Sequence, residues 1–368
     1  MATHVMLVPG FFGFTSLGQV GYFRHVEVAL GSALAAAGRP ATVHGLDVGP
    51  TASLPRRAAR IGHQILGKTA PDDEVVVVGH STGGLDARVL LAPQVELPGL
   101  SEPALAARRI RAVVSVCTPH YGTPVADYFT SLPGQSALKA LSLSTIALLR
   151  LGPLPPKAIG ALASMLTSRQ SLIDNVYNEL LAGLDDQQAE EVRAFMREVR
   201  DDTTLLQQLR PSAIELLKMT LHAPPEVAMG CVVAASPAPG LRSVAKQGLS
   251  AANQTSHLVF AALRRMAGDF DARYQAALPE GTRERLAALD DVLGAPGASD
   301  GMVPTVSQVH GQIITGVVAD HLDVLGHFED RSAVPPHYDW LVSGSRFRRP
   351  AFDGLWREVA RWIDGALG

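Results

Sequence analysis

The stretch Val77-Val78-Gly79-His80-Ser81-Thr82-Gly83-Gly84 decides the fold of this 368-residue chain. It contains the pattern Gly-x-Ser-x-Gly, with an apolar β-branched run at 74–78 before it and a helix-forming run at 85–91 after it. A serine between a strand and a helix in this pattern occupies a strained turn, and the small residues around it avoid backbone collisions. The helix N-terminus favours developing negative charge. The segment predicts Ser81 as a nucleophile, and a glycine-rich turn with a capping serine is the alternative.

Other apolar runs repeat this strand pattern along the chain. They predict strands at 4–8, 41–46, 110–117, 227–235 and 312–319, and helical spacing is found at 22–37, 54–66 and 352–367. Runs that are apolar on both faces are typical of parallel strands covered on two sides. The alternation predicts an α/β fold with a mostly parallel central sheet and helices on both of its faces.

The middle of the chain differs from the rest. Between 127 and 221 no good strand is found, and the segment contains a Leu/Ala/Ser-rich part and a charged amphipathic helical part. We interpret 127–221 as a helical cap or lid inserted into a core formed by 1–126 and 222–368. An ordinary helical layer is the alternative interpretation.

Composition excludes several classes of function. The formal net charge is -3 and no basic block is present, so a nucleic-acid partner is not expected. No run is long and apolar enough for a transmembrane span. The chain shows no signal peptide, which fits either a cytoplasmic protein or the mature form of a secreted one. Cys117 and Cys231 lie in apolar runs and predict two buried reduced thiols, with a single bridge as the alternative.

A serine nucleophile needs a base and an orienting acid, which follow it in the order acid, then histidine, in this fold class. His321 comes directly after the strand predicted at 312–319, whereas His310 precedes that strand. Asp300 stands in a turn 21 residues before His321. We therefore expect His321 as base and Asp300 as acid. Further histidines follow in loop-like sequence at 327 and 337, and Asp290 and Asp291 fit a solvated helix face.

The oxyanion formed in acyl transfer requires two backbone N–H donors. One is expected from Thr82, the residue after the nucleophile. The other is expected from the loop after an early strand, most simply from Phe11 after Pro9-Gly10. Donors of this type lower the barrier by about 3 kcal/mol each.

Five ordered motifs together resemble the bacterial triacylglycerol lipases, the lidded true lipases of the α/β-hydrolase superfamily. They are Pro9-Gly10-Phe11-Phe12-Gly13-Phe14 with Gly21-Tyr22-Phe23, the segment 79–88 around Ser81, Thr118-Pro119-His120-Tyr121-Gly122-Thr123, Asp300-Gly301-Met302-Val303-Pro304, and His321-Leu322-Asp323. The resemblance covers most of the chain outside the middle. It implies the α/β-hydrolase fold with a lid.

The resemblance also implies a metal ligand. The aspartate after the catalytic histidine, here Asp323, is a calcium ligand in that family, and the ion would be structural and not required for the chemistry. A second calcium aspartate should lie upstream of Asp300, where Asp290, Asp291 and Glu280 compete. The family's usual histidine-glycine in the oxyanion loop is Pro9-Gly10 here, and its disulfide does not map onto the two cysteines.

These patterns predict a serine hydrolase that cleaves carboxylic esters. The apolar middle segment favours lipids or other water-insoluble acyl esters, met at an oil–water interface. A general esterase, a polyester hydrolase and an acyltransferase on the same residues remain alternatives. A catalytically silent lipid-binding protein is the alternative outside enzymes. The oligomeric state stays open.

Overall fold

The structure is a computed structural model that describes residues 2–11, 22–131, 186, 189–190, 193, 197, 202, 204–239, 251–270, 278–339 and 341–368. The predicted cap at 127–221 lies largely outside the described residues; apart from six single positions between 186 and 202, only its two flanks are described. These flanks contain α5 (Pro124–Phe129), α10 (Thr204–Gln208) and α11 (Pro211–Lys218). The cap therefore stays a prediction.

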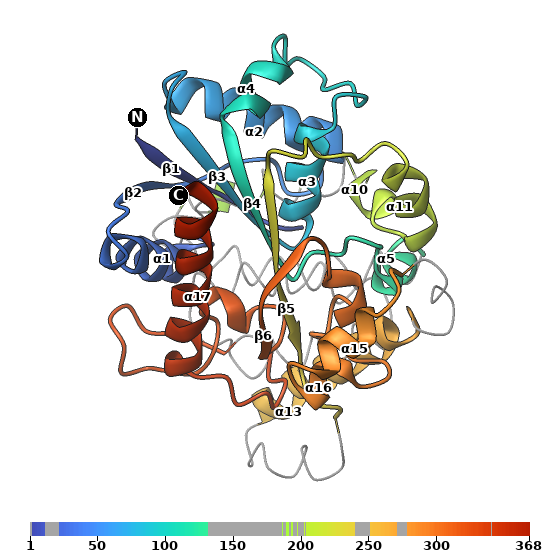
Figure 1. The fold of residues 1–368 in the computed structure, drawn as a ribbon. Helices are drawn as coiled ribbons and strands as arrows, with labels where there is room; N and C mark the ends of the chain where they lie inside the picture. The colour runs from blue at the N-terminus through green and yellow to red at the C-terminus, as the bar shows by residue number, and fades with distance from the viewer. Residues whose placement is uncertain are drawn as a thin grey trace.

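One all-parallel sheet of six strands forms the centre of the described protein, in the order β2-β1-β3-β4-β5-β6 (Figure 1). The six strands are β1 (Thr3–Val8), β2 (Ala41–Gly45), β3 (Glu74–His80), β4 (Ile110–Val116), β5 (Ala228–Ala235) and β6 (Gln312–Val318). All neighbours pair in parallel. Each strand falls within two residues of an apolar run identified in the sequence. The inner strands β1, β3, β4 and β5 are mostly buried, which requires continuous apolar runs.

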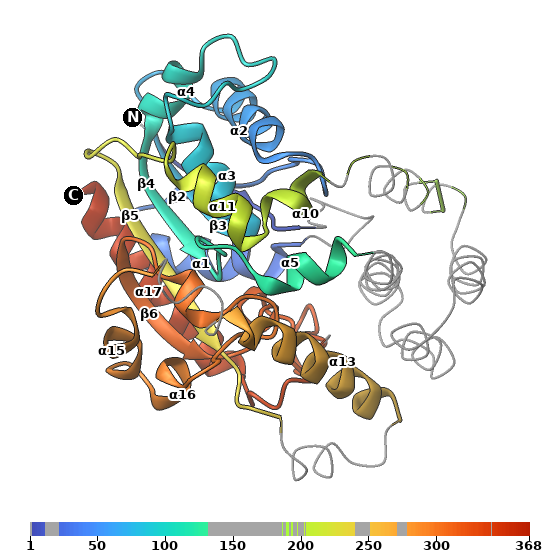
Figure 2. The ribbon, with the colours of Figure 1, turned by 90° about the vertical axis from the view of Figure 1, so that its right-hand side faces the viewer.

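Helices cover both faces of this sheet (Figures 1 and 2). One face packs against α1 (Arg24–Ala36) and α17 (Arg349–Leu367), and the other packs against α2 (Leu54–Lys68), α3 (Thr82–Leu91) and α4 (Pro103–Arg109). Alternate residues of β3 serve the two layers, since Val75 and Val77 face α2 and α3 while Val76 and Val78 face α1 and α17. The sheet is thus the middle layer of three.

The remaining described helices follow β5 in the sequence and precede β6. They are α13 (Ala251–Gly268), α15 (Thr282–Ala287) and α16 (Asp291–Gly294), with the short 3-10 turn η2 (Thr305–Gln308), while the 3-10 turn η3 (Asp323–Leu325) follows β6. Within the described part of the chain, no helix combines the length and apolarity that crossing a membrane needs. Because the strands are parallel, the residues that follow β1, β3, β5 and β6 meet at one edge of the sheet, and the candidate site lies there.

Candidate active site

Ser81 occupies the turn between β3 and α3. Its backbone has φ 54° and ψ −125°, a left-handed conformation that is rare outside glycine. A Cβ at Gly79 would collide with the backbone of Gly83, and a Cβ at Gly83 would collide with the carbonyl oxygen of Val8. The two glycines are therefore required by close packing of the turn, as the sequence pattern predicts.

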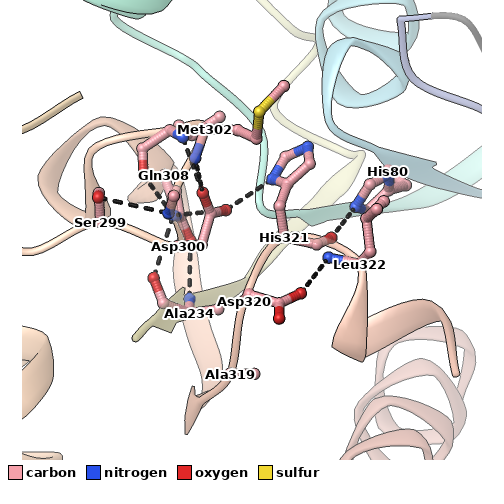
Figure 3. A network of polar contacts seen from close by, with 12 residues as sticks. His80, Ala234, Ser299, Asp300, Met302, Gln308, Ala319, Asp320, His321 and Leu322 are labelled. Atoms are coloured by element: carbon pink, nitrogen blue, oxygen red, sulfur yellow. Dashed lines mark hydrogen bonds and ion pairs between the residues drawn. The ribbon is translucent and has the colours of Figure 1, made fainter. Parts of the chain in front are cut away.

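His321 and Asp300 are joined directly. Nδ1 of His321 lies 2.7 Å from Oδ2 of Asp300, which is fully buried, and the backbone N–H of His321 donates to the Asp300 carbonyl oxygen at 2.9 Å (Figure 3). An ionised carboxylate only accepts, so Nδ1 carries the proton and Nε2 is left as the basic nitrogen. Asp300 stands after β5 and His321 directly after β6, so neighbouring strand ends bring the pair together.

The carboxylate of Asp300 is held by further donors. Its Oδ1 accepts from the N–H groups of Met302 at 2.9 Å and Val303 at 2.7 Å, and Nε2 of Gln308 donates to Oδ2 at 3.2 Å (Figure 3). Both oxygens are thus satisfied. This fixes the direction in which the acid meets the imidazole.

Ser81 and His321 line one small pocket of about 50 Å³. Ser81 is 8% exposed and His321 is 5% exposed, so both are nearly closed off from solvent. The rest of the wall is mostly apolar and includes Phe129 on α5 and Leu206 on α10. The flanks of the predicted cap therefore contribute apolar side chains beside the serine.

The loop after β1 lies against the serine. A Cβ at Gly10 would stand 2.6 Å from Cβ of Ser81 and 3.2 Å from its Oγ, so the loop can approach this closely only with glycine. Phe11, the predicted oxyanion donor, lines the same pocket, and Thr82 begins α3 at the helix N-terminus. Phe11 thus lies in the same pocket as Ser81, and Thr82 is its neighbour in the chain.

A buried ion pair supports this loop. Arg57 on α2 and Asp86 on α3 are both fully buried, with Nη2 of Arg57 2.7 Å from Oδ2 of Asp86. The same guanidinium donates to the carbonyl oxygens of Pro9 at 2.6 Å and of Gly49. Burial raises the pKa of Asp86 to about 6, while the charge of Arg57 opposes the shift. The pair ties the loop after β1 to the two helices.

Cys117 also lies beside the acid and the histidine. Among the described residues, Cys117, Asp300 and His321 form a group whose potential ligand atoms all lie within 4.8 Å of one another. Burial raises the pKa of the Cys117 thiol well above its usual range, and the charge of Asp300 raises it further. The thiol is therefore held neutral. Both Cys117 and Cys231 are buried and free, as predicted.

Asp323 is buried in a group of carboxylates. Its Oδ2 accepts from the N–H of Asp320 at 2.9 Å and from the hydroxyl of Ser345 at 2.7 Å. Burial, together with the charges of Asp320 and Asp339, raises the pKa of Asp323, and burial raises that of Asp339 to about 8. One oxygen of Asp320 and one of Asp339 have no hydrogen-bond partner among the described residues. Orphaned, buried carboxylate oxygens fit a hard cation such as calcium.

The upstream acids considered from the sequence are placed elsewhere. Asp290 accepts from the N–H of Val292 at 2.7 Å and caps α16, while Asp291 and Glu280 are exposed. The carboxylates beside Asp323 come instead from the same loop and from Asp339. The distance in sequence between 323 and 339 hid this neighbourhood.

The other histidines do not reach the acid in the described structure. His310 lies against His120, with ring centroids 4.7 Å apart, and Nδ1 of His337 contacts the Gly326 carbonyl oxygen at 2.7 Å. Sequence reasoning missed Arg57 and Cys117 as neighbours of the site. Arg57 had a signal, because it stands on the apolar stripe of α2 formed by Leu54, Ile61 and Ile65.

The sequence matches no family model and no curated protein. The structure is similar to solved structures of lipases and esterases. It resembles Staphylococcus hyicus lipase with a TM-score of 0.52 and 14% identity, covering 99% of this chain and 96% of that one. A metagenomic carboxyl esterase gives 0.51 and 17%, covering 99% and 76%, and lipase 1 of Pelosinus fermentans gives 0.50 and 15%, covering 98% and 99%. At these identities the likeness shows the α/β-hydrolase fold, and it confirms the predicted fold class.

Proposed function

We propose that this chain is a serine hydrolase that cleaves carboxylic esters through an acyl-enzyme. The observation that carries the proposal is the 2.7 Å contact between His321 and Asp300, made where His321 shares a pocket with Ser81. The proposal is supported by the likeness of the fold to lipases and carboxyl esterases. The chemistry itself needs no cofactor.

Each candidate residue has its own role in the proposed reaction. Nε2 of His321 takes the proton of the Ser81 hydroxyl, and the serine oxygen attacks the ester carbonyl. Asp300 holds the imidazole in the required tautomer and stabilises its charged form. The N–H groups of Phe11 and Thr82 bind the oxyanion. His321 then protonates the leaving alcohol, and water, deprotonated by the same nitrogen, releases the acid.

The apolar pocket wall favours acyl chains over charged substrates. Phe129, Leu206 and Leu209 come from the flanks of 127–221, the segment we infer to be a lid. A lid with an apolar inner side covers an acyl chain and presents apolar surface when it opens. The substrate class we propose is therefore lipid or other water-insoluble acyl esters.

The direct test is labelling with a fluorophosphonate ester, followed by identification of the modified residue. We expect one label per chain, on Ser81, and p-nitrophenyl acyl ester hydrolysis at background level in Ser81→Ala. Cys117→Ala is the matched control for the neighbouring thiol and should still be labelled. An unlabelled wild-type protein, or labelling that persists in Ser81→Ala, contradicts the proposal and favours a silent lipid-binding protein.

A chain-length series separates the alternatives within enzymes. Rates that rise from acetyl to long acyl esters support the lipase class, while a preference for acetyl esters indicates a general esterase. An added alcohol that diverts the product from acid to new ester indicates an acyltransferase. Release of soluble fragments from an aliphatic polyester film identifies a polyester hydrolase.

We also propose a structural calcium ion beside the histidine loop. Asp323 would hold it together with the carboxylates of Asp320 and Asp339. Each of these two has an oxygen without a hydrogen-bond partner among the described residues, and carboxylate oxygens are ligands that suit calcium. The ion would neutralise like charges and tie the loop that carries His321 to the segment around 339. It takes no part in the reaction steps.

A further inference from the structure

The peptide between Pro9 and Gly10 is held at both of its polar atoms. The Pro9 carbonyl oxygen accepts from Nη2 of Arg57 at 2.6 Å. The N–H of Gly10 donates to the hydroxyl oxygen of Tyr22 at 3.3 Å. Because a peptide unit is planar, two contacts at opposite sides fix the orientation of the whole plane. That plane directly precedes Phe11, the proposed oxyanion donor.

The same Tyr22 hydroxyl joins His80, the residue before the serine. The hydroxyl oxygen lies 2.7 Å from Nδ1 of His80, and Nε2 of His80 lies 2.9 Å from the carbonyl oxygen of His321 (Figure 3 shows this second contact). The network therefore connects the loop after β1, the last residue of β3 and the loop after β6.

The direction of each hydrogen bond follows from the acceptors. A carbonyl oxygen only accepts, so Nε2 of His80 carries its proton. A neutral imidazole has a single N–H, so Nδ1 accepts and the Tyr22 hydroxyl donates to it. The same hydroxyl oxygen accepts from the N–H of Gly10. Every donor in the series meets an acceptor, because the single hydroxyl oxygen of Tyr22 both accepts from the Gly10 N–H and donates to the imidazole.

Burial keeps this series in one protonation state. Desolvation lowers the pKa of His80 well below its usual range, and the neighbouring His321, with ring centroids 4.6 Å apart, lowers it further. Desolvation also raises the pKa of Tyr22. His80 stays neutral and Tyr22 stays protonated at neutral pH, so the hydrogen-bond directions persist.

We propose that the Tyr22 hydroxyl is a positioning group that sets the Gly10–Phe11 loop against Ser81 and, through His80, the main chain that carries His321. This inference rests on the proposed ester hydrolysis. Tyr22 itself touches no reacting atom. Its hydroxyl acts by placing the oxyanion donor, which must lie within about 2.7–3.1 Å of the oxygen that becomes charged.

The Tyr22→Phe variant tests the proposal, because it keeps the ring and removes only the hydroxyl. An interaction needed only in the transition state lowers kcat and leaves KM unchanged. We expect kcat to fall roughly 10- to 100-fold, the range for a small misplacement of catalytic groups, with KM unchanged. An alkyl trifluoromethyl ketone forms the oxyanion with the serine, so its Ki should rise by the same factor. The corresponding secondary alcohol forms no oxyanion, and its Ki should not change.

A double-mutant cycle tests the route through His80. His80→Gln keeps an N–H donor for the His321 carbonyl and loses the acceptor for Tyr22. The double variant with both Tyr22→Phe and His80→Gln should be as active as the less active of the two single variants, because both substitutions break the same contact. Tyr338→Phe, which removes a hydroxyl outside the network, is the control and should match wild type.

The outcomes separate this inference from the proposed function. Rates are normalised to active sites titrated with the fluorophosphonate. If wild type is not labelled, the proposed function fails and this inference fails with it. If wild type is labelled but Tyr22→Phe keeps wild-type kcat and ketone Ki, only the role of Tyr22 is overturned. Equal weakening of ketone and alcohol with a lower melting temperature, or additive losses in the cycle, would also overturn it.

Discussion

At the scale of single residues, the acid of the candidate site is defined by its hydrogen bonds. Asp300 is fully buried, accepts two backbone N–H groups at one oxygen, and contacts His321 and Gln308 at the other. All of these partners are donors. A side chain with an N–H group in this position would place a donor against another donor, and no hydrogen bond could form between them.

Asp300→Asn should therefore separate structure from catalysis. The amide must turn its N–H₂ toward one set of donors, and His321 loses the acceptor that selects its tautomer. We expect kcat for p-nitrophenyl esters to fall roughly 10³- to 10⁴-fold, the order found when this role is removed from a serine hydrolase. Asp290→Asn changes the cap of α16 and none of the hydrogen bonds described for Asp300, and serves as control. A loss of less than tenfold would remove Asp300 from the role of orienting acid.

His310 provides a prediction about pH. Burial lowers its pKa to about 3, against about 6.5 in an unfolded chain. The unfolded state therefore binds a proton that the folded state refuses, and stability falls as pH drops from about 6.5 toward 3. His310→Gln should reduce the acid-side slope of unfolding free energy by about 1.4 kcal/mol per pH unit. Urea unfolding between pH 7 and pH 4 measures it, and an unchanged slope would contradict the assignment.

The sequence could predict the residues that follow strands, and it could not predict those that meet by packing. Ser81, Asp300 and His321 each follow a readable strand or turn signal. Tyr22, Arg57 and the neighbours of Asp323 act across elements, and no local pattern shows which helix faces which loop. The stripe position of Arg57 was a signal that a buried charge needs a partner.

At the scale of elements, the turn between β3 and α3 determines what the sequence tolerates. Gly79 and Gly83 have no space for a methyl group, because the atoms they would meet belong to the backbone. The helix α3 begins at Thr82, earlier than its helix-forming residues suggest, since the turn and the neighbouring strands hold the glycines in helical form. Tertiary packing overrides propensity here.

Two glycine substitutions should have opposite signs. Gly79→Ala forces apart the turn between β3 and α3. We expect a loss of several kcal/mol in unfolding free energy together with loss of activity. Gly354→Ala, inside α17 with nothing within 4 Å of the added methyl, should gain about 0.5–1 kcal/mol. Chemical denaturation of both variants gives the comparison. A stable, active Gly79→Ala would show that the turn can relax.

At the scale of the whole molecule, the site is assembled from distant parts of the chain. One edge of the sheet carries all of these parts: the loop after β1, the turn after β3, and the loops after β5 and β6. The alternating pattern of strands and helices made this edge predictable, since parallel strands place their carboxyl ends together. Most of the predicted lid lies outside the described residues.

The proposed calcium site predicts that the ion stabilises this edge of the sheet. If Asp320, Asp323 and Asp339 hold the ion, adding calcium to chelator-treated protein at roughly one hundred times its Kd should stabilise by about 2.7 kcal/mol. The melting temperature should rise with calcium and not with magnesium. Magnesium demands a near-ideal octahedral geometry and keeps several bound waters, so it rarely occupies a site formed only by protein groups. Asp323→Asn should abolish the rise while Asp290→Asn keeps it. An equal response in Asp323→Asn and wild type would rule out this ligand set.

The two ends of the chain lie near each other, away from this edge (Figures 1 and 2). Residue 2 stands just before β1, at the amino end of that strand, and the carboxyl end of β1 leads to Gly10. The last turns of α17 are tied to the segment before β2, where Arg39 contacts Asp364 at 2.8 Å. A six-residue strand separates that end from Gly10 by about 20 Å. A support or fusion partner attached at either end would therefore stand at the edge of the sheet opposite the one that carries Ser81.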